Sequence, residues 1–312
     1  MMRSEKLANS CGKYLSQLMD NDSAIIVLDG DLADSNGAIY VQEKYENRFI
    51  MCGIAEQCMV SMAAGFAVEG YTPWVFSFAS FLCYRAYDQI RVSVAQCNAN
   101  VKLVGSHAGG FTGRNGKTHS AINDIAMMSS IPNMRIYSPA SPEDTEWAVG
   151  EMNKHDGPAY IRLPREAMSS GTWKLGSWTW ITKRTSVAIV TTGLALKIAN
   201  QVREQFKNLF DEEIGIINTV AIHPVPQDLI EELNNFVDYV IVIEDHLTSH
   251  GLAALLKCHQ LKCKIDQFGW PIDYMADSGD YEDILKHSEL NPEKITTHIK
   301  NRYAFNDNYL AR

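Results

Sequence analysis

Segments with strand character alternate with segments of helix character along the whole chain, and this order restricts the possible fold more than any other feature. The strand-like runs are short, apolar and end in Gly, Pro or Asp. The runs between them are longer, and their apolar residues recur every three or four positions, which predicts helices. In the first half, strands are predicted at 23–33, 47–53, 71–79, 100–108, 133–140 and 158–164, and helices at 55–70, 85–96, 121–131 and 141–153. Such alternation predicts an α/β fold, with a parallel sheet covered by helices on both faces.

The regular pattern is interrupted once. Residues 169–184 are rich in Ser, Gly, Thr and Trp, and the strand–helix alternation restarts after them. We therefore expect two doubly wound domains, at residues 1–168 and 185–312, with a linker at 169–184. The total of 312 residues agrees with the usual length of about 150 residues per domain.

Composition argues against several classes of protein. The chain is 46% hydrophobic and 21% charged, which is typical of a soluble globular protein. Its apolar runs are too short to span a membrane, and the first residues lack the pattern of a signal peptide. The net charge of −9, without a basic block, makes nucleic acid a poor partner. Seven scattered cysteines without a CxxC pair argue against a disulfide framework or a zinc site, and favour reduced, buried thiols in the cytoplasm.

One acid interrupts a nearly continuous run of small and apolar residues. Glu56 lies within the segment "MCGIAEQCMVSMAAGFAVEG", residues 51–70. The residues expected to form the buried helix face beside it are Met59, Met62, Ala63, Phe66 and Ala67. A carboxylate in such surroundings is costly unless it is compensated or protonated. The segment alone leaves two interpretations open: an acid stabilised by the dipole at a helix N-terminus, or an acid with a chemical role.

Polar segments follow several of the predicted strands. They are "DGDLADSNG" at 29–37, "CGIAEQ" at 52–57, "GSHAGGFTGRNGKTH" at 105–119 and "LPRE" at 163–166. The carboxyl ends of parallel strands meet at one edge of a sheet, and ligands bind at that edge. We therefore expect these four segments to form a binding site.

The same segments carry a resemblance to a known family. Three stretches resemble the pyrimidine-binding domain of the transketolase family: residues 53–95, which begin "GIAEQCMVSMAAGFAVEG", residues 105–149, and "GPAYIRLPRE" at 157–166. The second half, with "VAIVTTG", "HPVPQDLIEEL" and "IVIEDH", resembles the C-terminal domain of that family. The resemblance covers nearly the whole chain in the right order, and implies a thiamine-diphosphate pyrimidine-binding domain followed by a smaller α/β domain.

The resemblance also implies a partner chain. A complete transketolase carries a diphosphate-binding domain ahead of these two domains, with a Gly-Asp-Gly motif and a downstream Asn for magnesium. Here an Asp-Gly-Asp sequence begins at Asp29, without a full domain ahead of it. The chain therefore resembles the second half of a split, two-subunit enzyme. We expect a homodimer that pairs with two diphosphate-binding chains, an α2β2 heterotetramer whose magnesium ligands lie on the partner and not on this chain.

The family assigns roles to individual positions. The acid at the Glu56 position hydrogen-bonds the N1′ nitrogen of the thiamine aminopyrimidine and favours its imino form. The residues expected to contact the cofactor are Glu56, Phe81, Phe78, Asp31 and Arg85. Those expected to contact substrate are the two histidines His107 and His119, together with Ser35, Arg165, Arg114, Asn115 and Lys117. With Glu56, the two histidines are the expected catalytic residues.

Plainer interpretations of these positions stay open. The phenylalanines are equally typical of a strand-end core, Asp31 of a turn, and loop histidines of an exposed surface. The family pattern also requires a one-residue shift between Phe81 and Arg85. His246 and His250 of the second half are expected to be structural or surface residues.

The sequence departs from common transketolases around the expected substrate loop. Those enzymes have Gly-Glu-Asp-Gly-Pro before the Thr-His pair, whereas this chain has Gly-Arg-Asn-Gly-Lys at residues 113–117. An acid is thus replaced by Asn115, and two cations are added. Ser10 stands where a phosphate-binding arginine is expected. Arg114 and Lys117 would form a new anion pocket or a solvated loop, and ribose and xylulose phosphates are not secure substrates.

Several functions remain open. The first is the transfer of a two-carbon ketol unit from a ketose to an aldehyde-type acceptor. The enzymatic alternatives are the beta subunit of a 2-oxo acid dehydrogenase decarboxylase and a carboligase that forms a deoxyxylulose-type product from pyruvate. A non-catalytic regulatory or scaffold subunit is the alternative of another class, disfavoured by the retained Glu56, His107, His119 and Arg165.

Overall fold

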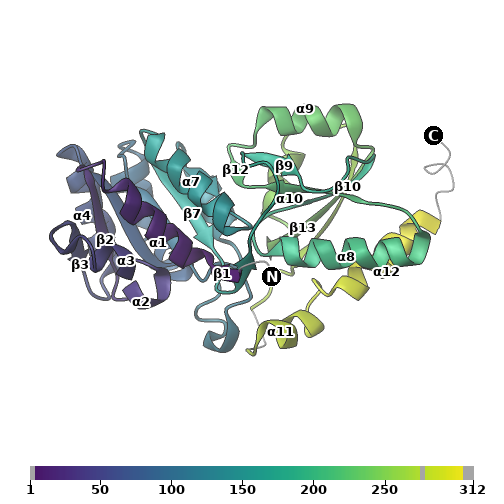
Figure 1. Ribbon diagram of the computed structural model, residues 1–312, viewed down its shortest axis with the longest axis horizontal. Helices are drawn as coiled ribbons and strands as arrows, with labels where there is room; N and C mark the ends of the chain where they lie inside the picture. Colours follow the sequence, from purple (N-terminus) through teal and green to yellow (C-terminus); the bar gives the residue numbers. More distant parts are fainter. Residues whose placement is uncertain (1–3, 275–277, 305–312) are drawn as a thin grey trace.

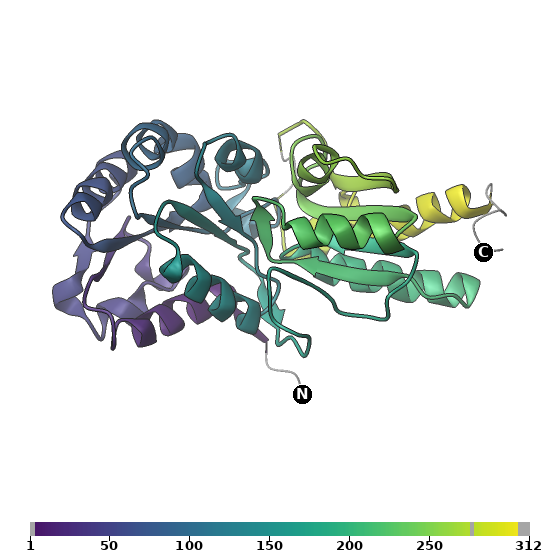
Figure 2. The same cartoon turned by 90° about the horizontal axis from the view of Figure 1, so that it is seen from above.

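The computed structural model describes residues 4–274 and 278–304, which form two α/β domains side by side (Figures 1 and 2). The first domain is built on a seven-stranded sheet with the order β12-β6-β7-β5-β4-β2-β3, and the second on a five-stranded sheet with the order β14-β13-β10-β11-β9. Within each sheet the strands pair in parallel, except for the edge strands β12 and β9. The predicted fold of two doubly wound α/β domains is confirmed.

All six strands predicted in the first half are present. The strands of the seven-stranded sheet are β2 (Ile25–Asp29), β3 (Phe49–Met51), β4 (Thr72–Phe78), β5 (Lys102–Ser106), β6 (Arg135–Tyr137), β7 (Ala159–Leu163) and β12 (Ala221–His223). The central strands β2, β4, β5 and β7 are buried along their whole length, as expected for a sheet covered on both faces. A separate antiparallel pair joins β1 (Ser4–Lys6) to β8 (Ala167–Ser169).

Helices cover both faces of this sheet (Figure 2). On one face, α1 (Leu7–Leu18) packs against α7 (Pro142–Lys154). The opposite face carries α4 (Glu56–Val68), α5 (Tyr87–Gln89) and α6 (Asp124–Ser129), and α2 (Ala33–Asn36) and α3 (Ile39–Gln42) are short turns after β2. The predicted start of α7 is confirmed, because Ser141 Oγ accepts the backbone N–H of Asp144 at 3.0 Å.

The segment predicted as one helix at residues 85–96 differs from the prediction. A short α5 lies between two π-helical turns, η2 (Phe81–Arg85) and η3 (Ile90–Ala95). Two further short turns are 3₁₀-helical, η1 (Glu46–Arg48) and η4 (Gly113–Asn115). Propensity and periodicity predict that a helix forms, but they do not distinguish an i→i+4 from an i→i+5 hydrogen-bond pattern.

The second domain repeats the layered arrangement. Its strands are β9 (Trp178–Trp180), β10 (Val187–Thr191), β11 (Gly215–Thr219), β13 (Tyr239–Leu247) and β14 (Lys264–Trp270). Its helices are α8 (Ala195–Phe210), α9 (Gln227–Phe236), α10 (Leu252–Lys257), α11 (Tyr281–His287) and α12 (Pro292–Ala304). In Figure 1, α8 and α12 run together on one side of the sheet and α9 lies on the other.

The two halves of the chain are interlaced at their junction. Strand β9 falls inside the expected linker at 169–184, yet it pairs with β11 of the second sheet. Strand β12, from the second half, pairs with β6 of the first sheet. The division at residues 168 and 185 remains a prediction.

Two sequence expectations about side chains need correction. On α4, Met59 and Ala63 are buried as expected, but Met62 is 38% exposed. All seven cysteines are unpaired, yet only Cys11 and Cys83 are fully buried. The exposed cysteines are Cys58, Cys97 and Cys258. Within the described ranges, no helix combines the length and apolar character that a membrane crossing requires.

A buried ion pair joins the first sheet to the second domain. The Arg162 guanidinium, on β7, donates to both carboxylate oxygens of Asp124, from Nε at 2.9 Å and from Nη2 at 3.1 Å. The same Nη2 donates to the backbone oxygen of Asp245 on β13, at 3.0 Å. Tyr160 adds a hydroxyl donor to Asp124 at 2.8 Å, so this carboxylate is well compensated although it is fully buried.

We expect Arg162→Leu to lower the free energy of unfolding by about 3–5 kcal/mol, because it leaves the Asp124 carboxylate buried and unpaired. Urea denaturation followed by circular dichroism measures this loss. Arg91→Leu is the matched control, since Arg91 pairs with Asp88 on the exposed surface. An equal, small loss in both variants would contradict the assignment.

Candidate active site

The four polar segments that follow the predicted strands meet at one edge of the first sheet. Strands β2, β3, β4, β5 and β7 run parallel, so their carboxyl ends share that edge. Asp29 ends β2, and both of its carboxylate oxygens are used by the following loop. Oδ1 accepts the N–H of Leu32 at 2.8 Å and Oδ2 accepts the amide of Asn36 at 2.6 Å. This loop carries Asp31, which has a φ of 67°.

Glu56 is the first residue of α4, and its side chain is only 1% exposed. Its Oε2 accepts a hydrogen bond from Arg85 Nη1 at 2.6 Å. Its other oxygen, Oε1, is buried and has no hydrogen-bond partner among the residues that the structure describes. A buried oxygen without a partner is costly, and such an atom in a native protein calls for an explanation.

Aromatic rings gather beside this carboxylate. Phe78, at the end of β4, stacks on Phe81 with a centroid distance of 5.6 Å. The guanidinium of Arg85 lies 4.6 Å from the centroid of the Phe81 ring, so Arg85 contacts Phe81 and Glu56 at once. Phe78 is buried, whereas Phe81 is half-buried. The structure thus brings together four of the five residues predicted to contact the cofactor.

Both loop histidines reach the same aromatic cluster. The His107 ring lies 4.1 Å from the Phe78 ring, and the His119 ring lies 5.3 Å from the Phe81 ring. Burial lowers the pKa of His107 to about 4, and the nearby positive groups Arg165, Lys6 and His119 act in the same direction. His107 is therefore neutral at physiological pH, which suits hydrogen bonding without a fixed charge. Residues from the end of β4, from α4 and η2, and from the loop after β5 therefore converge on one site.

The remaining predicted residues lie in different settings. Arg165 is half-buried, and its Nη1 donates to the backbone oxygen of Thr112 at 2.9 Å, beneath the loop that carries both histidines. Asp31 and Ser35 are exposed after β2. Ser10, at the position of the expected arginine, is 4% exposed on α1 and lies against the core. A buried serine on this helix face cannot take the place of an exposed guanidinium.

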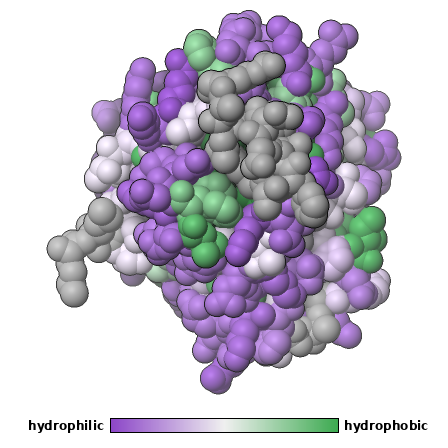
Figure 3. Space-filling model, turned by 90° about the vertical axis from the view of Figure 1, so that its right-hand side faces the viewer, coloured by the Kyte–Doolittle hydropathy of each residue, from purple (hydrophilic) through white to green (hydrophobic). Residues whose placement is uncertain are grey.

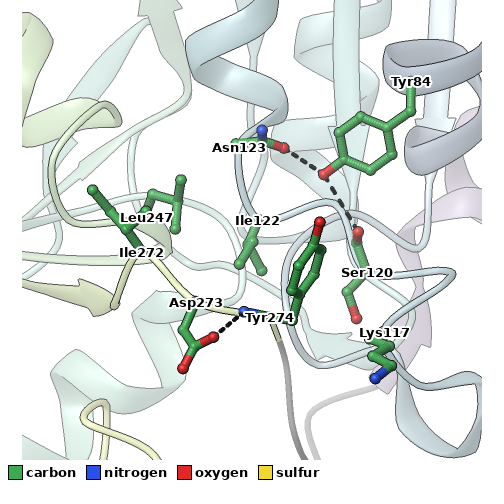
Figure 4. Close-up of a pocket in the computed structure, with 9 residues that line it drawn as sticks. All are labelled: Tyr84, Lys117, Ser120, Ile122, Asn123, Leu247, Ile272, Asp273 and Tyr274. Atoms are coloured by element: carbon green, nitrogen blue, oxygen red, sulfur yellow. Dashed lines mark hydrogen bonds between the residues drawn. The ribbon is translucent and has the colours of Figure 1, made fainter.

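The loop cations are exposed, and one of them lines a pocket. Arg114 and Asn115 are exposed on η4. Lys117 lines a pocket of about 600 Å³ between the histidine loop and the second domain (Figure 4). Its other lining residues are Tyr84, Ser120, Ile122, Asn123, Leu247, Ile272, Asp273 and Tyr274. Figure 4 shows the Tyr84 hydroxyl held by Asn123 and by the backbone of Ser120.

Comparisons with known proteins agree with this arrangement. Residues 5–170 match the family "Transketolase, pyrimidine binding domain", and residues 176–295 match "Transketolase, C-terminal domain". The chain belongs to the transketolase family.

Relatives within the transketolase family differ in how much of their length the chain covers. A protein of Methanocaldococcus jannaschii named "Putative transketolase C-terminal section" is 31% identical over 92% of this chain and 93% of its own length. The 1-deoxy-D-xylulose-5-phosphate synthase of Clostridium acetobutylicum is 29% identical, and the chain spans 48% of that enzyme.

Solved structures give the same fold. A structure described as "Split gene transketolase, inactive beta4 tetramer" superposes with a TM-score of 0.84 at 25% identity, over 96% of this chain and 98% of that one. A transketolase from Campylobacter jejuni superposes with a TM-score of 0.83 at 18% identity over 96% of this chain, which covers 47% of that chain. The predicted resemblance to the transketolase family is confirmed.

Sequence reasoning missed the polar residues that hold this transketolase-type site in place. Asp29 organises the loop after β2, and Asp124 and Asp245 connect the histidine loop to the rest of the protein. His246, expected to be structural or on the surface, is fully buried, and burial lowers its pKa to about 4. Its Nε2 accepts the N–H of Ala126 at 3.4 Å. Asp124, Asp245 and His246 act through partners distant in sequence, so local motifs give little signal for them.

Histidine titration tests the setting of His107. We expect its ring to titrate near pH 4, against about 6.5 in an unfolded chain, in NMR spectra assigned with the variant His107→Gln. Because the folded pKa is the lower one, the unfolded chain binds the extra proton between these values. The folded chain therefore loses no stability through His107 above pH 6.5, and its free energy of unfolding decreases as the pH falls from 6.5 towards 4. A midpoint near 6.5 in the folded chain would contradict the buried setting.

Proposed function

We propose that this chain is the pyrimidine-binding subunit of a thiamine-diphosphate-dependent enzyme that transfers a two-carbon ketol unit from a ketose to an aldehyde-type acceptor. The observation that carries the proposal is the buried Oε1 of Glu56, unpartnered among the described residues, beside the stacked rings of Phe78 and Phe81. Membership of the transketolase family supports the same reaction class.

The residues present fit an aminopyrimidine ring. Such a ring offers a flat apolar face for Phe81 and a basic nitrogen for a carboxyl group that holds a proton. Glu56 Oε1 is a buried oxygen that lacks such a partner within the described ranges, and Arg85 already holds Oε2 at 2.6 Å. When bound, thiamine diphosphate supplies a carbon nucleophile and an electron sink for breaking and forming bonds next to a carbonyl.

This chain's own residues then have distinct tasks. Glu56 Oε1 exchanges a proton with the ring nitrogen, while Arg85 fixes the orientation of the carboxyl group through Oε2. Neutral His107, together with His119, lines the space next to the aromatic rings, and both rings hydrogen-bond substrate oxygens. Arg165, bonded to the histidine loop through the backbone oxygen of Thr112, provides a positive charge for an anionic substrate group.

We expect Glu56→Gln to lower kcat by about 10²–10⁴-fold, because the amide keeps the shape but cannot hold and return a proton. Turnover is measured with the chain reconstituted with a diphosphate-binding partner, thiamine diphosphate and magnesium. Glu69→Gln is the matched control, since Glu69 is exposed at the other end of α4. Wild-type kcat in Glu56→Gln would remove this acid from the mechanism.

An exposed apolar face near the site supports self-association. Ile54 is 74% exposed and Val68 is 80% exposed, at opposite ends of α4. The other large apolar residues exposed in the first domain are Met51, Met62, Tyr71, Tyr84 and Val92. Between them α4 exposes Cys58, Ser61 and Gly65, whose small size permits a close approach of another helix. By contrast, the far end of the second domain is mostly hydrophilic (Figure 3).

We infer that the α4 face contacts a second copy of this chain, and that the resulting dimer binds two diphosphate-binding subunits. This assembly places thiamine diphosphate between subunits, with the magnesium ligands on the partner chain. The Methanocaldococcus relative, named as a C-terminal section, supports the existence of a separate first section.

The isolated chain is therefore expected to bind thiamine diphosphate weakly or not at all, because its residues hold only the pyrimidine end of the cofactor. Titration calorimetry with and without magnesium measures this, and light scattering of the same sample gives the oligomeric state. Adding the partner chain should produce tight, magnesium-dependent binding. Tight binding by the isolated chain would contradict the split-site proposal.

The two loop cations favour an acceptor that carries a negative group. Arg114 and Lys117 add positive potential on the loop that joins the two histidines, which favours an anionic acceptor and speeds its capture at low salt. A phosphate in the ordinary sugar-phosphate pose would meet Arg165, but Ser10 is buried and offers no second cation. We propose that the acceptor's negative group lies nearer Arg114 and Lys117.

Accordingly, ribose 5-phosphate should be a poor acceptor. Changing Arg114 and Lys117 together to Gln should raise KM for the true acceptor by about ten- to a hundredfold, through the loss of charged contacts. The assay uses the reconstituted enzyme, a panel of phosphorylated, carboxylated and neutral aldehydes, and two salt concentrations. Lys257→Gln with Lys262→Gln, in the second domain, is the control. If ribose 5-phosphate is the best acceptor and the loop variant matches wild type, the loop is only a solvated surface.

One alternative reaction has a specific observation in its favour. Several relatives from Clostridium species are named 1-deoxy-D-xylulose-5-phosphate synthase and match at 29–30% identity. A carboligase of that type would use pyruvate as donor instead of a ketose. The same reconstituted assay distinguishes the two, because release of carbon dioxide from pyruvate occurs only in the second reaction.

A further inference from the structure

The loop between β5 and α6, residues 107–123, carries both histidines. The second domain holds this loop at two stems. At the first stem, the N–H of Gly110 donates to Asp245 Oδ1 at 2.9 Å. At the second stem, the N–H of Leu247 donates to the backbone oxygen of Ile122 at 2.7 Å. Asp245 and Leu247 both belong to β13, so one strand end of the second domain contacts both stems.

The two stems are also bonded to each other. Gly109 and Ala121 form an isolated antiparallel bridge, with N–H···O distances of 3.0 and 3.1 Å. The bridge closes the loop at its neck, so a displacement of either stem moves the whole segment 109–121. His119 lies inside this closed loop, and His107 lies two residues before its neck.

The fit between the first stem and the second domain is too close for any side chain. A Cβ atom added to Gly109 would lie 1.9 Å from Asp245 Oδ2, and one added to Gly110 would lie 2.5 Å from the Trp270 ring. The Trp270 indole in turn donates to Asp245 Oδ1 at 2.6 Å, and this ring also packs on Phe111 at 5.2 Å. The Gly-Gly sequence thus lets the loop backbone lie directly on a carboxylate and an indole.

The carboxylate itself is fixed by its surroundings. Asp245 is 2% exposed, and its Oδ1 accepts both the Gly110 N–H and the Trp270 indole N–H. Its backbone oxygen accepts Arg162 Nη2 at 3.0 Å, which connects it to the buried Asp124–Arg162 pair. Because Asp245 is bonded from several sides, its carboxylate has a fixed position. Its hydrogen bond to the Gly110 N–H therefore fixes the loop relative to the second domain.

We propose that Asp245 is a positioning residue for the reaction: through Gly110 it holds the histidine loop against Phe78 and Phe81, so that the second domain sets the geometry of the substrate-binding histidines. This inference rests on the proposed function for its kinetic consequence. Its structural consequence, the placement of His107, is independent of any reaction.

The structural consequence is measured by NMR titration of His107 in the full chain. In the wild type the ring lies 4.1 Å from Phe78 and is buried. Asp245→Ala removes the acceptor, releases the stem and exposes the ring to water, so the His107 midpoint should move up by about 1–2 pH units, towards the value of a solvated histidine. Asp245→Asn keeps an acceptor oxygen and should restore most of the wild-type midpoint.

A second perturbation approaches the same contact from the other side. Gly110→Ala pushes the stem away from Trp270 while leaving Asp245 intact, and should shift the His107 midpoint in the same direction. Trp270→Phe removes the indole atoms that the new methyl group would meet, so the double variant should return towards wild type. Glu232→Ala is the matched control, because Glu232 also accepts a tryptophan indole N–H, that of Trp180, within the second domain.

The kinetic consequence is measured in the reconstituted enzyme. Displacing the histidines should lower kcat/KM for the acceptor by about 10–100-fold, since misplacement of about 1 Å has effects of this size. Affinity for thiamine diphosphate should stay at the wild-type value, because Glu56 and Phe81 lie on α4 and η2 and not on the loop. A general loss of stability would instead weaken cofactor binding and catalysis together.

The outcomes separate clearly. The proposal is supported if the His107 midpoint shifts in Asp245→Ala and Gly110→Ala. It also requires rescue in Asp245→Asn and in the double variant with Trp270→Phe, and no change in Glu232→Ala. A wild-type midpoint in the variants that fold overturns it, and Gly110→Ala decides the matter if Asp245→Ala does not fold. If the midpoints shift but the wild-type complex transfers no ketol unit with any donor, the proposed function fails while the control of the loop by Asp245 stands.

Discussion

The buried carboxylate of Glu56 is the constraint around which the first domain is arranged. Removing a carboxylate from water costs several kcal/mol, and this one is only 1% exposed. Two compensations are present: the N-terminus of α4 and the guanidinium of Arg85, bonded to Oε2 at 2.6 Å. Neither reaches Oε1, which remains buried and unpartnered within the described part of the chain. If folding stability were the only requirement, this oxygen would have a hydrogen-bond partner within the chain or would be exposed to water. The arrangement therefore favours an external partner.

Much of the fold and part of the site follow from the sequence. Strands β2 to β7 of the first sheet were predicted because each is a short apolar run that ends in a turn residue, and a parallel sheet then brings their carboxyl ends together. This placement predicts that the segments carrying Glu56 and the two histidines converge, and the family resemblance adds Phe78 and Phe81. The distances of 4.1 Å from His107 to Phe78 and 5.3 Å from His119 to Phe81 agree. Local pattern succeeds here because each strand is recognisable from its own residues. The parallel topology of the sheet then determines that the segments after the strands lie at the same edge.

The contacts that hold the site in place were not predictable in the same way. The bond from Gly110 to Asp245 spans 135 positions, and that from Arg162 to Asp124 spans 38. A glycine pair in a loop is typical of a turn, and its sequence does not reveal that an indole and a carboxylate lie on its backbone. Exposure of Met62 and Cys58 on α4 was likewise hidden, because periodicity identifies an apolar helix face but not whether this chain or another one covers it.

The π-helical turn after β4 has the geometry to absorb the one-residue shift that the family resemblance implies between Phe81 and Arg85. An extra residue in a regular helix would rotate everything after it by about 100°. Here the N–H of Ala86 bonds to the oxygen of Phe81 at 3.2 Å, an i→i+5 turn that holds one residue more than an α-turn. Such a turn accommodates an extra residue without rotating the rest of the helix. Arg85 lies over the Phe81 ring at 4.6 Å and also bonds Glu56, so the π-turn keeps the residues of the proposed cofactor contacts together.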